Sequence, residues 1–209
     1  MNVEHRDSYG LAIRALKRFA SEGRFGWGEP LVVKDLAAEI GLSPTPVREA
    51  LACLSGEGLI ERQRGRGYFF PALTASDIID LYDLQWSYLH SALTLHARGA
   101  AALHKAAAAL DPEAGFAPLF AAMVAHSAND ALITAYDQLA KRLAPVWRAE
   151  ADLIVAFQPT AAAIVRAVTA ANCAELLQLV GAHHRQRCEL AGETARLLRR
   201  TASEDMEEI

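Results

Sequence analysis

The stretch of sequence that decides the fold is "GLSPTPVREAL", residues 41–51, in which two prolines stand directly in front of good helix formers. Proline is tolerated in the first turn of a helix, because the amide that it lacks would have no acceptor inside the helix. The segment therefore predicts a rigid helix start that presents Ser43, Thr45 and Arg48 outward.

The elements around this helix start follow a recognisable order. Apolar residues at helical spacing predict a first helix that ends near residue 23, and a short second helix that Gly41 stops. After the third helix, "LIERQRGRGYFFP" contains two short β-prone runs joined by a turn rich in Gly and Arg, which indicates a hairpin. Three helices followed by a hairpin is the order of a winged helix-turn-helix.

The second half of the chain has a different texture. From about residue 73 it consists of long, Ala-rich helical segments with no further strand pattern. Helices are expected over about 76–105, from Asp111 onward, over 130–157, from 158 to about 172 and over 174–200. The fold class is thus mainly α, with a winged helix-turn-helix domain at 1–72, an all-helical bundle at 73–200 and an acidic, disordered tail at 201–209.

Composition limits the classes of function. The 209 residues are 52% hydrophobic and 22% charged, as in ordinary globular proteins, and no apolar run reaches the roughly 18 residues of a membrane helix. The first ten residues carry no hydrophobic signal segment, so a cytoplasmic location is expected. The three cysteines have no metal-binding spacing. Neither a nucleophile elbow nor a phosphate-binding glycine loop is present, so we expect no enzymatic activity.

The charge distribution favours a local contact with nucleic acid. The net charge is −4, but residues 1–72 hold ten Lys/Arg against nine Asp/Glu, leaving eleven against sixteen for the rest of the chain. Arg62, Arg64 and Arg66 lie close together in the hairpin. A local basic region on a nearly neutral domain is typical of a site-specific binder.

The helix start at residues 43–48 suits a duplex. In a helix-turn-helix the second helix of the motif enters the major groove, and its first residues contact base edges and flanking phosphates. Ser43 and Thr45 can bond phosphate oxygens, and Arg48 can bind a guanine through two parallel hydrogen bonds. In the alternative interpretation the two hydroxyls only cap a helix and Arg48 forms a surface ion pair.

The run "LAAEIGLSPTPVREALACLSGEGLIERQRGRGYFF" resembles the DNA-binding domain of GntR-family transcription regulators, over most of residues 9–72. The resemblance implies contacts with DNA. Two further contacts are expected from the residues themselves, Ser43 at the helix start and Arg64 in the hairpin. The positions that match the contacts of the family are Lys34, Thr45, Arg48, Arg66 and Gly67. Two departures are visible: Pro44 replaces a common arginine, and Val32 replaces a capping serine.

Residues 73–200 are similar to the FadR C-terminal (FCD) ligand-binding domain, in which one aspartate and three histidines hold a divalent metal. Here Phe116, Phe120 and Ala161 occupy three of those positions and only His183 remains. One imidazole cannot supply the ligands that a zinc-like site requires, so we expect no metal there. An alternative ligand set could come from His90, His96, His126 and His184, although solvated or hydrogen-bonded histidines are the simpler interpretation.

Without a metal, the bundle lacks the ion that would bind the carboxylate of an organic acid. An apolar or aromatic effector then fits best, with His183 or Arg148 as its polar anchor, and by resemblance a lipid-like acyl thioester is one candidate. Equally, the aromatic side chains could fill the space completely. The candidate lining residues are Tyr82, Gln85, Trp86, Phe116, Phe120, Met123, Trp147, Arg148 and His183.

These features together predict a DNA-binding regulator of the GntR/FCD type. We expect a homodimer on a pseudo-palindromic operator, since two-fold symmetry lets paired winged helices read two half-sites. The alternative is a helical interaction module without an effector, whose winged helix binds protein rather than DNA.

Overall fold

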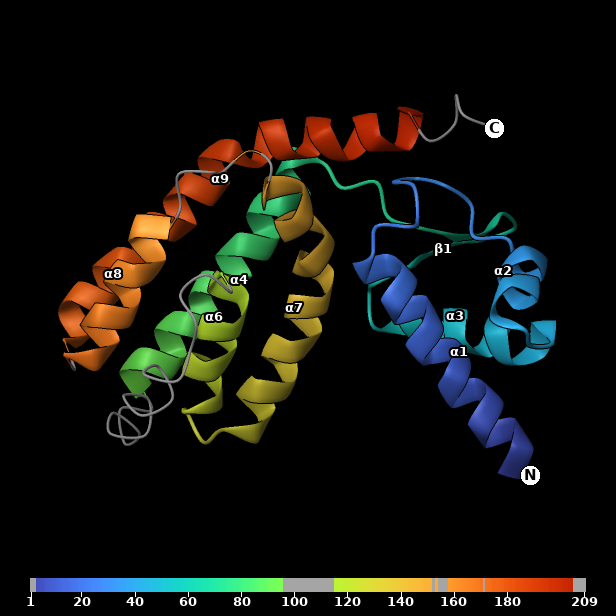
Figure 1. Ribbon diagram of the computed structural model, residues 1–209, viewed down its shortest axis with the longest axis horizontal. Coiled ribbons are helices and arrows are strands. Elements are labelled where there is room, and N and C mark those ends of the chain that lie inside the picture. Colours follow the sequence, from blue (N-terminus) through green and yellow to red (C-terminus); the bar gives the residue numbers. More distant parts are fainter. Residues whose placement is uncertain (1–2, 96–114, 152, 154–157, 171, 205–209) are drawn as a thin grey trace. The chain divides into compact units, whose positions relative to one another are not determined.

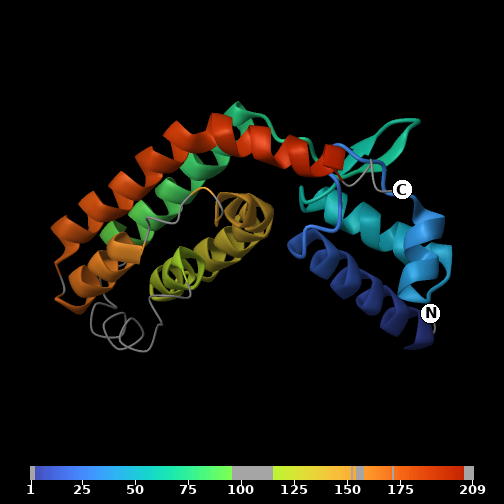
Figure 2. The ribbon, with the colours of Figure 1, turned by 45° about the horizontal axis from the view of Figure 1, so that its top comes forward.

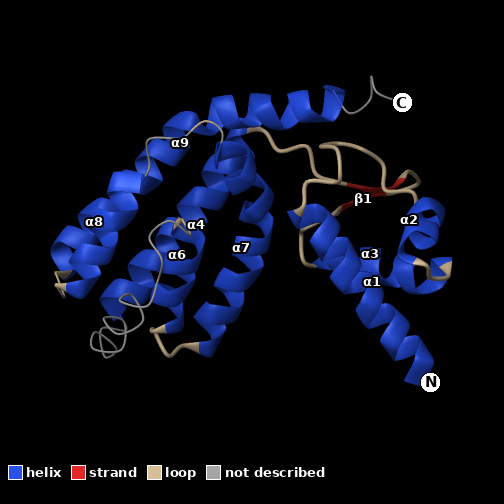
Figure 3. Ribbon diagram, viewed as in Figure 1, coloured by secondary structure: helices blue, strands red, loops and turns tan. Residues whose placement is uncertain are grey.

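The structure is a computed structural model, and it describes residues 3–95, 115–151, 153, 158–170 and 172–204 (Figure 1). The chain divides into two compact units, which are described separately: Met1–Leu73 with Ala195–Ile209, and Thr74–Thr194. Helices dominate both units, and the strands in the described ranges are two short ones in the first unit (Figure 3). The mainly helical fold class is therefore confirmed. No helix in these ranges has the length and apolar character that crossing a membrane requires.

The first unit has the predicted winged helix-turn-helix order. Its core comes from the helices, with Leu16, Leu51 and Leu54 completely buried, and α3 packs against both α1 and α2. The elements are α1 (Val3–Ser21), α2 (Val33–Ile40), α3 (Pro44–Gly56), β1 (Glu61–Gln63) and β2 (Gly67–Phe69).

Gly41 ends α2 as the sequence predicts. Its backbone is left-handed, with φ 76°, a conformation that glycine adopts without steric cost. The amide of Leu42 then donates to the carbonyl of Ala37 at 2.9 Å, which closes the helix end. At the other end Val32 supplies no side-chain hydrogen bond to the helix, consistent with the missing capping serine. The turn between α2 and α3 therefore contains only three residues, which are Gly41, Leu42 and Ser43.

The hairpin is larger than the sequence indicated. β1 and β2 pair antiparallel, with Arg62 opposite Tyr68. Residues 28–31, whose Gly and Pro content is typical of a turn, pair with the outer edge of β2. The amide of Leu31 donates to Tyr68 at 2.7 Å, and Gly28 and Phe70 bond at 2.8 Å. Its backbone hydrogen bonds anchor the wing to the domain.

The second unit is a helical bundle. In it α4 packs against α6 and α7, and α8 lies alongside α9 in both views (Figures 1 and 2). The helices are α4 (Ala75–Leu95), α6 (Phe116–Ala125), α7 (Asp130–Ala151), α8 (Gln158–Thr169) and the part of α9 (Cys173–Glu204) up to Thr194.

Helix ends agree with the sequence at some positions and differ at others. Residues 74–77, at the start of α4, form a reciprocal capping box: Asp77 accepts from the Thr74 amide at 2.8 Å, and the Asp77 amide donates to the Thr74 hydroxyl at 3.2 Å. The Thr74 hydroxyl, which also donates to the Asp77 carboxylate at 2.6 Å, lowers the pKa of Asp77, and the bond from the Thr74 amide adds to this shift. By contrast, α9 continues to Glu204, beyond the predicted end at residue 200. The expected helix start at Asp111 and the tail residues 205–209 lie outside the described residues.

Candidate functional site

The tip of α3 holds two exposed hydroxyl side chains that are not used in capping. Ser43 occupies the N-cap position with extended backbone, φ −72° and ψ 158°, yet its side chain makes no cap hydrogen bond. An N-cap hydroxyl normally accepts from the second or third amide of the helix, and here the third residue is Pro46, which has no N–H. Thr45 is exposed beside it. Both hydroxyl-bearing residues are therefore exposed at the positive end of the helix dipole.

Arg48 lies one turn into the same helix and is exposed. It forms no hydrogen bond or ion pair with any residue that the structure describes. Other cations of this unit do have acidic partners: Lys17 lies 2.8 Å from Glu57, and Arg24 is paired with Glu39. The interpretation of Arg48 as one half of a surface ion pair therefore finds no support in the structure.

The wing presents further cations on a short turn. The Arg66 amide donates to the Gln63 carbonyl at 3.1 Å, and Gly65 takes φ 76° inside that turn. Arg64 and Arg66 are exposed, and the Arg66 guanidinium lies 5.2 Å from the centre of the Phe69 ring. Gly67 follows with φ 103°, a value that other residues rarely adopt.

The seven predicted DNA contacts share one unit and one property. All are exposed on α2, α3 or the hairpin, and α3 contacts both α2 and β1. The residues are Lys34, Ser43, Thr45, Arg48, Arg64, Arg66 and Gly67.

The second unit places His183 among aromatic rings. The imidazole is 3% exposed, and its centre lies 4.3 Å from the Phe116 ring and 5.0 Å from the Phe120 ring. Burial, followed by the charge of Arg187, lowers the pKa of His183 to about 3, so the ring is neutral near pH 7. Ala161, which the resemblance to the FCD domain placed at another ligand position, is also buried. Phenyl rings thus pack directly against the remaining histidine.

A buried polar cluster next to His183 was not predicted from the sequence. Glu150 is 1% exposed, and its carboxylate accepts from Arg187 at 2.8 Å, from the Tyr82 hydroxyl at 2.6 Å and from the Thr194 hydroxyl at 3.4 Å. Arg187 also contacts the His183 imidazole at 3.3 Å. Burial raises the pKa of Glu150, although Arg187 opposes the shift.

A signal for this cluster was present in the sequence. Glu150 follows Leu143 and Val146 at helical spacing, and Arg187 follows Val180 and His183 in the same way. All six residues lie on buried helix faces. Charged residues on an apolar face indicate a paired, desolvated cluster.

The remaining candidate pocket residues are distributed differently. Gln85 is buried and donates to the Tyr136 hydroxyl at 3.4 Å, and Met123 belongs to the apolar core with Phe120. Trp86 and Trp147 are half-buried, and Arg148 is exposed. The structure brings Phe116, Phe120 and His183 into direct contact, and it leaves the Arg148 side chain outside this buried group.

The alternative histidine ligand set is not assembled. His126 bonds its own helix through Nδ1 and the Ala122 carbonyl at 2.7 Å, and His90 lies against Trp86. His96 lies outside the described residues. Within the described ranges, the one group with metal-binding geometry contains His184 but none of the other three.

Comparison with known proteins agrees with the first unit. Residues 9–70 match the family model of bacterial regulatory proteins, gntR family. The chain is 38% identical over 68 residues to the Nta operon transcriptional regulator of Aminobacter aminovorans, and 33% identical over 70 residues to the HTH-type transcriptional regulator YdhC of Bacillus subtilis. These matches cover 32% and 34% of this chain and span 32% and 31% of the relatives, about a third of their length.

Solved structures extend the similarity of fold to most of the chain. E. coli McbR/YncC superposes with a TM-score of 0.68 at 18% identity, covering 89% of this chain and 97% of that one. A GntR transcriptional regulator from Rhodococcus sp. RHA1 gives 0.70 at 17% identity, covering 91% and 98%. The fold is therefore that of GntR-type regulators, and the sequence signature of the family lies in residues 9–70.

Proposed function

We propose that this chain is a GntR-type transcription regulator that binds a specific DNA duplex through its first unit. The observation that carries the proposal is the tip of α3, where Ser43, Thr45 and Arg48 are exposed and the guanidinium has no partner among the described residues. The tip lies within the stretch that matches the gntR family model. The names of the curated relatives, both transcriptional regulators, support the same class rather than an enzyme.

The proposed contacts follow from the chemistry of each group. Ser43, Thr45 and the amide at the helix start suit phosphate oxygens, since a helix N-terminus favours an anion. Arg48, which projects one turn farther along, suits the O6 and N7 atoms of guanine. Lys34 and the wing arginines Arg64 and Arg66 suit the flanking backbone, and Gly67 supplies the positive φ that follows the turn.

The proposal includes a dimer with an effector site in the second unit. One winged helix-turn-helix contacts few bases, so two of them on a pseudo-palindromic operator give useful specificity. The rings of Phe116 and Phe120 against His183 support a bundle without the metal of the FCD family, and they favour an apolar effector over a metal-held acid. Such an effector would have to displace or repack these rings.

The test begins with selection of bound sequences from a random duplex pool, followed by affinity measurements on the selected site. Arg48→Ala should weaken binding by about 5- to 150-fold, corresponding to 1–3 kcal/mol, and should relax base preference at one position of each half-site. Arg166→Ala removes an exposed arginine of α8 and is the matched control, which should bind as the wild type does.

Salt dependence separates DNA binding from the alternative of a protein-interaction module. The logarithm of the association constant should fall with the logarithm of salt, with a slope of about −0.9 for each phosphate neutralised. If the chain selects no sequence, the tip of α3 is not the proposed interface. If Arg48→Ala leaves the base preference unchanged, Arg48 does not read a base.

A further inference from the structure

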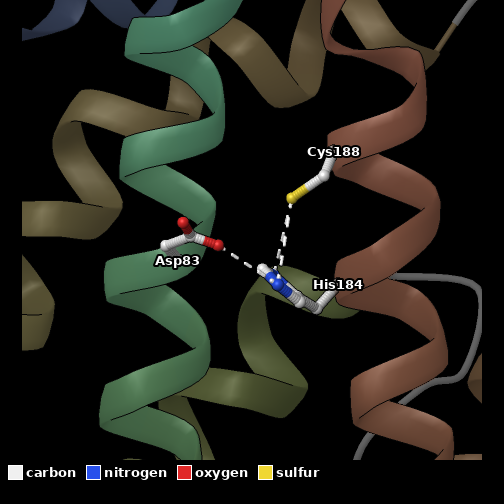
Figure 4. Close-up of side chains that lie close together, drawn as sticks. All are labelled: Asp83, His184 and Cys188. Carbon is white, nitrogen blue, oxygen red and sulfur yellow. Dashed lines mark hydrogen bonds and ion pairs between the residues drawn. The ribbon is translucent and has the colours of Figure 1, made fainter.

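A second group of side chains, separate from the DNA interface and from the His183 cluster, has the composition of a metal site. Asp83 comes from α4, and His184 and Cys188 come from α9 (Figure 4). The Asp83 Oδ1 atom lies 3.2 Å from His184 Nε2, and Cys188 Sγ lies 3.9 Å from the same nitrogen. One ligand atom from each residue lies within 4.8 Å of the others.

The backbone explains why these three residues meet. His184 and Cys188 are four residues apart on α9, so their side chains occupy the same helix face, one turn apart. Asp83 projects toward them from the neighbouring helix (Figure 4). His183 is adjacent to His184 in sequence, but it is buried between Phe116 and Phe120. The two histidines therefore lie in different surroundings.

The imidazole of His184 is held in position by its neighbours. The Trp86 indole stacks on it, with ring centres 5.9 Å apart and planes at 18°. The indole also packs close to the α9 backbone at Gly181, where a Cβ would lie 3.4 Å from Trp86 Cη2. A ligand whose ring is already oriented loses less freedom when it binds an ion.

We propose that Asp83, His184 and Cys188 form a three-ligand site for a divalent transition-metal ion of the zinc class. In tetrahedral zinc coordination, with bonds of about 2.0 Å to N and O and 2.3 Å to S, neighbouring ligand atoms are about 3.3 Å (N to O) and about 3.5 Å (N to S) apart. The observed separations of 3.2 Å and 3.9 Å are within a few tenths of an ångström of these values, and the Asp83 and Cys188 ligand atoms lie within 4.8 Å of one another.

The ligand set selects the class of ion and leaves one position open. Thiolate and imidazole favour zinc, cobalt or nickel over magnesium and calcium, which prefer oxygen. A carboxylate and a thiolate together balance the charge of a divalent ion. The Asp83 side chain is 61% exposed, so an ion can approach from solvent, and the fourth ligand is water or an external donor. The bound ion joins α4 to α9 within the second unit.

The experiment uses the full chain, reduced and freed of metal with a chelator. Titration with Co²⁺ should give a thiolate-to-cobalt charge-transfer band and the intense visible bands of tetrahedral cobalt, saturating at one equivalent. Zn²⁺ should displace cobalt and raise the temperature of unfolding, whereas Mg²⁺ should do neither.

The variants identify the ligands. Cys188→Ser should abolish the charge-transfer band, and Asp83→Asn, at an exposed position, should weaken Zn²⁺ binding at least about tenfold. Cys53→Ser, at the half-buried cysteine of α3, is the matched control and should bind as the wild type. Circular dichroism of the metal-free variants reports that each one folds.

Three results would overturn the site: no stoichiometric binding, binding without a thiolate band, or a band that survives Cys188→Ser and disappears with Cys53→Ser. None of these readouts involves DNA, so the metal site and the proposed regulator function succeed or fail separately.

Discussion

Removing Arg187 tests the buried cluster in the second unit. In Arg187→Met, a side chain of similar length keeps much of the packing but leaves the carboxylate of Glu150, which is 1% exposed, without the cation that now lies 2.8 Å away. Removing one partner of a buried ion pair lowers the free energy of unfolding by about 3–5 kcal/mol, because the remaining charge stays desolvated. At about 2–4 °C per kcal/mol for a chain of this length, the midpoint of thermal unfolding should fall by about 6–20 °C.

The pH dependence of this loss has a definite sign. Burial already raises the pKa of Glu150, and Arg187 opposes that shift, so the variant should raise the pKa further. A carboxyl whose folded pKa lies above its unfolded value stabilises the fold below the unfolded pKa, and this contribution is lost as the pH rises through the folded pKa. The deficit of Arg187→Met relative to wild type should therefore be smallest in acid and grow toward neutral pH.

Urea unfolding followed by circular dichroism at several pH values measures both effects. Arg185→Met, at an exposed arginine two residues earlier on α9, is the control and should stay within about 0.5 kcal/mol of wild type. Adding Glu150→Gln to Arg187→Met removes the buried charge and should recover much of the loss. A single variant that loses less than about 1 kcal/mol, or a double variant as unstable as the single one at neutral pH, would refute the reasoning from desolvation.

Other perturbations should act locally, and urea unfolding measures the first two. Thr74→Val removes both bonds that the Thr74 hydroxyl makes with Asp77, and should cost about 0.5–2 kcal/mol. Gly41→Ala places a Cβ on a backbone with φ 76°, and should cost about 1–2 kcal/mol, whereas a neutral result would mean that the helix end relaxes. Phe120→Ala should lose about 3–5 kcal/mol and admit water, so an NMR titration should find the pKa of His183 raised from about 3 toward its ordinary value; an unchanged pKa would mean that Phe120 does not exclude water from the ring.

The first unit could be predicted from local signals. Gly41, the prolines of residues 44 and 46 and the glycines of the hairpin each fix a backbone conformation within a few residues, so the order of elements followed directly. The segment at 28–31 was missed because its Gly and Pro content indicates a turn, whereas its pairing with β2 depends on residues almost forty positions away.

In the second unit the sequence predicted helices but not the partners of their polar side chains. Glu150 and Arg187 are 37 residues apart, and Asp83 and His184 are farther apart still. Only the tertiary packing joins them, although the position of Glu150 on an apolar helix face was visible. The spacing of His184 and Cys188 was visible too, but without Asp83 it is two ligands rather than a site.

The prolines at the start of α3 have a consequence for engineering. Pro46 has no amide N–H to donate to the Ser43 hydroxyl. An N-cap serine often stabilises its own helix through such a bond, whereas here the hydroxyl is left available for an outside partner. A substitution chosen only for thermal stability, which restored that amide, would bond the hydroxyl to the helix and weaken its proposed contact with phosphate. Selection for stability and selection for binding should therefore prefer different residues at position 46.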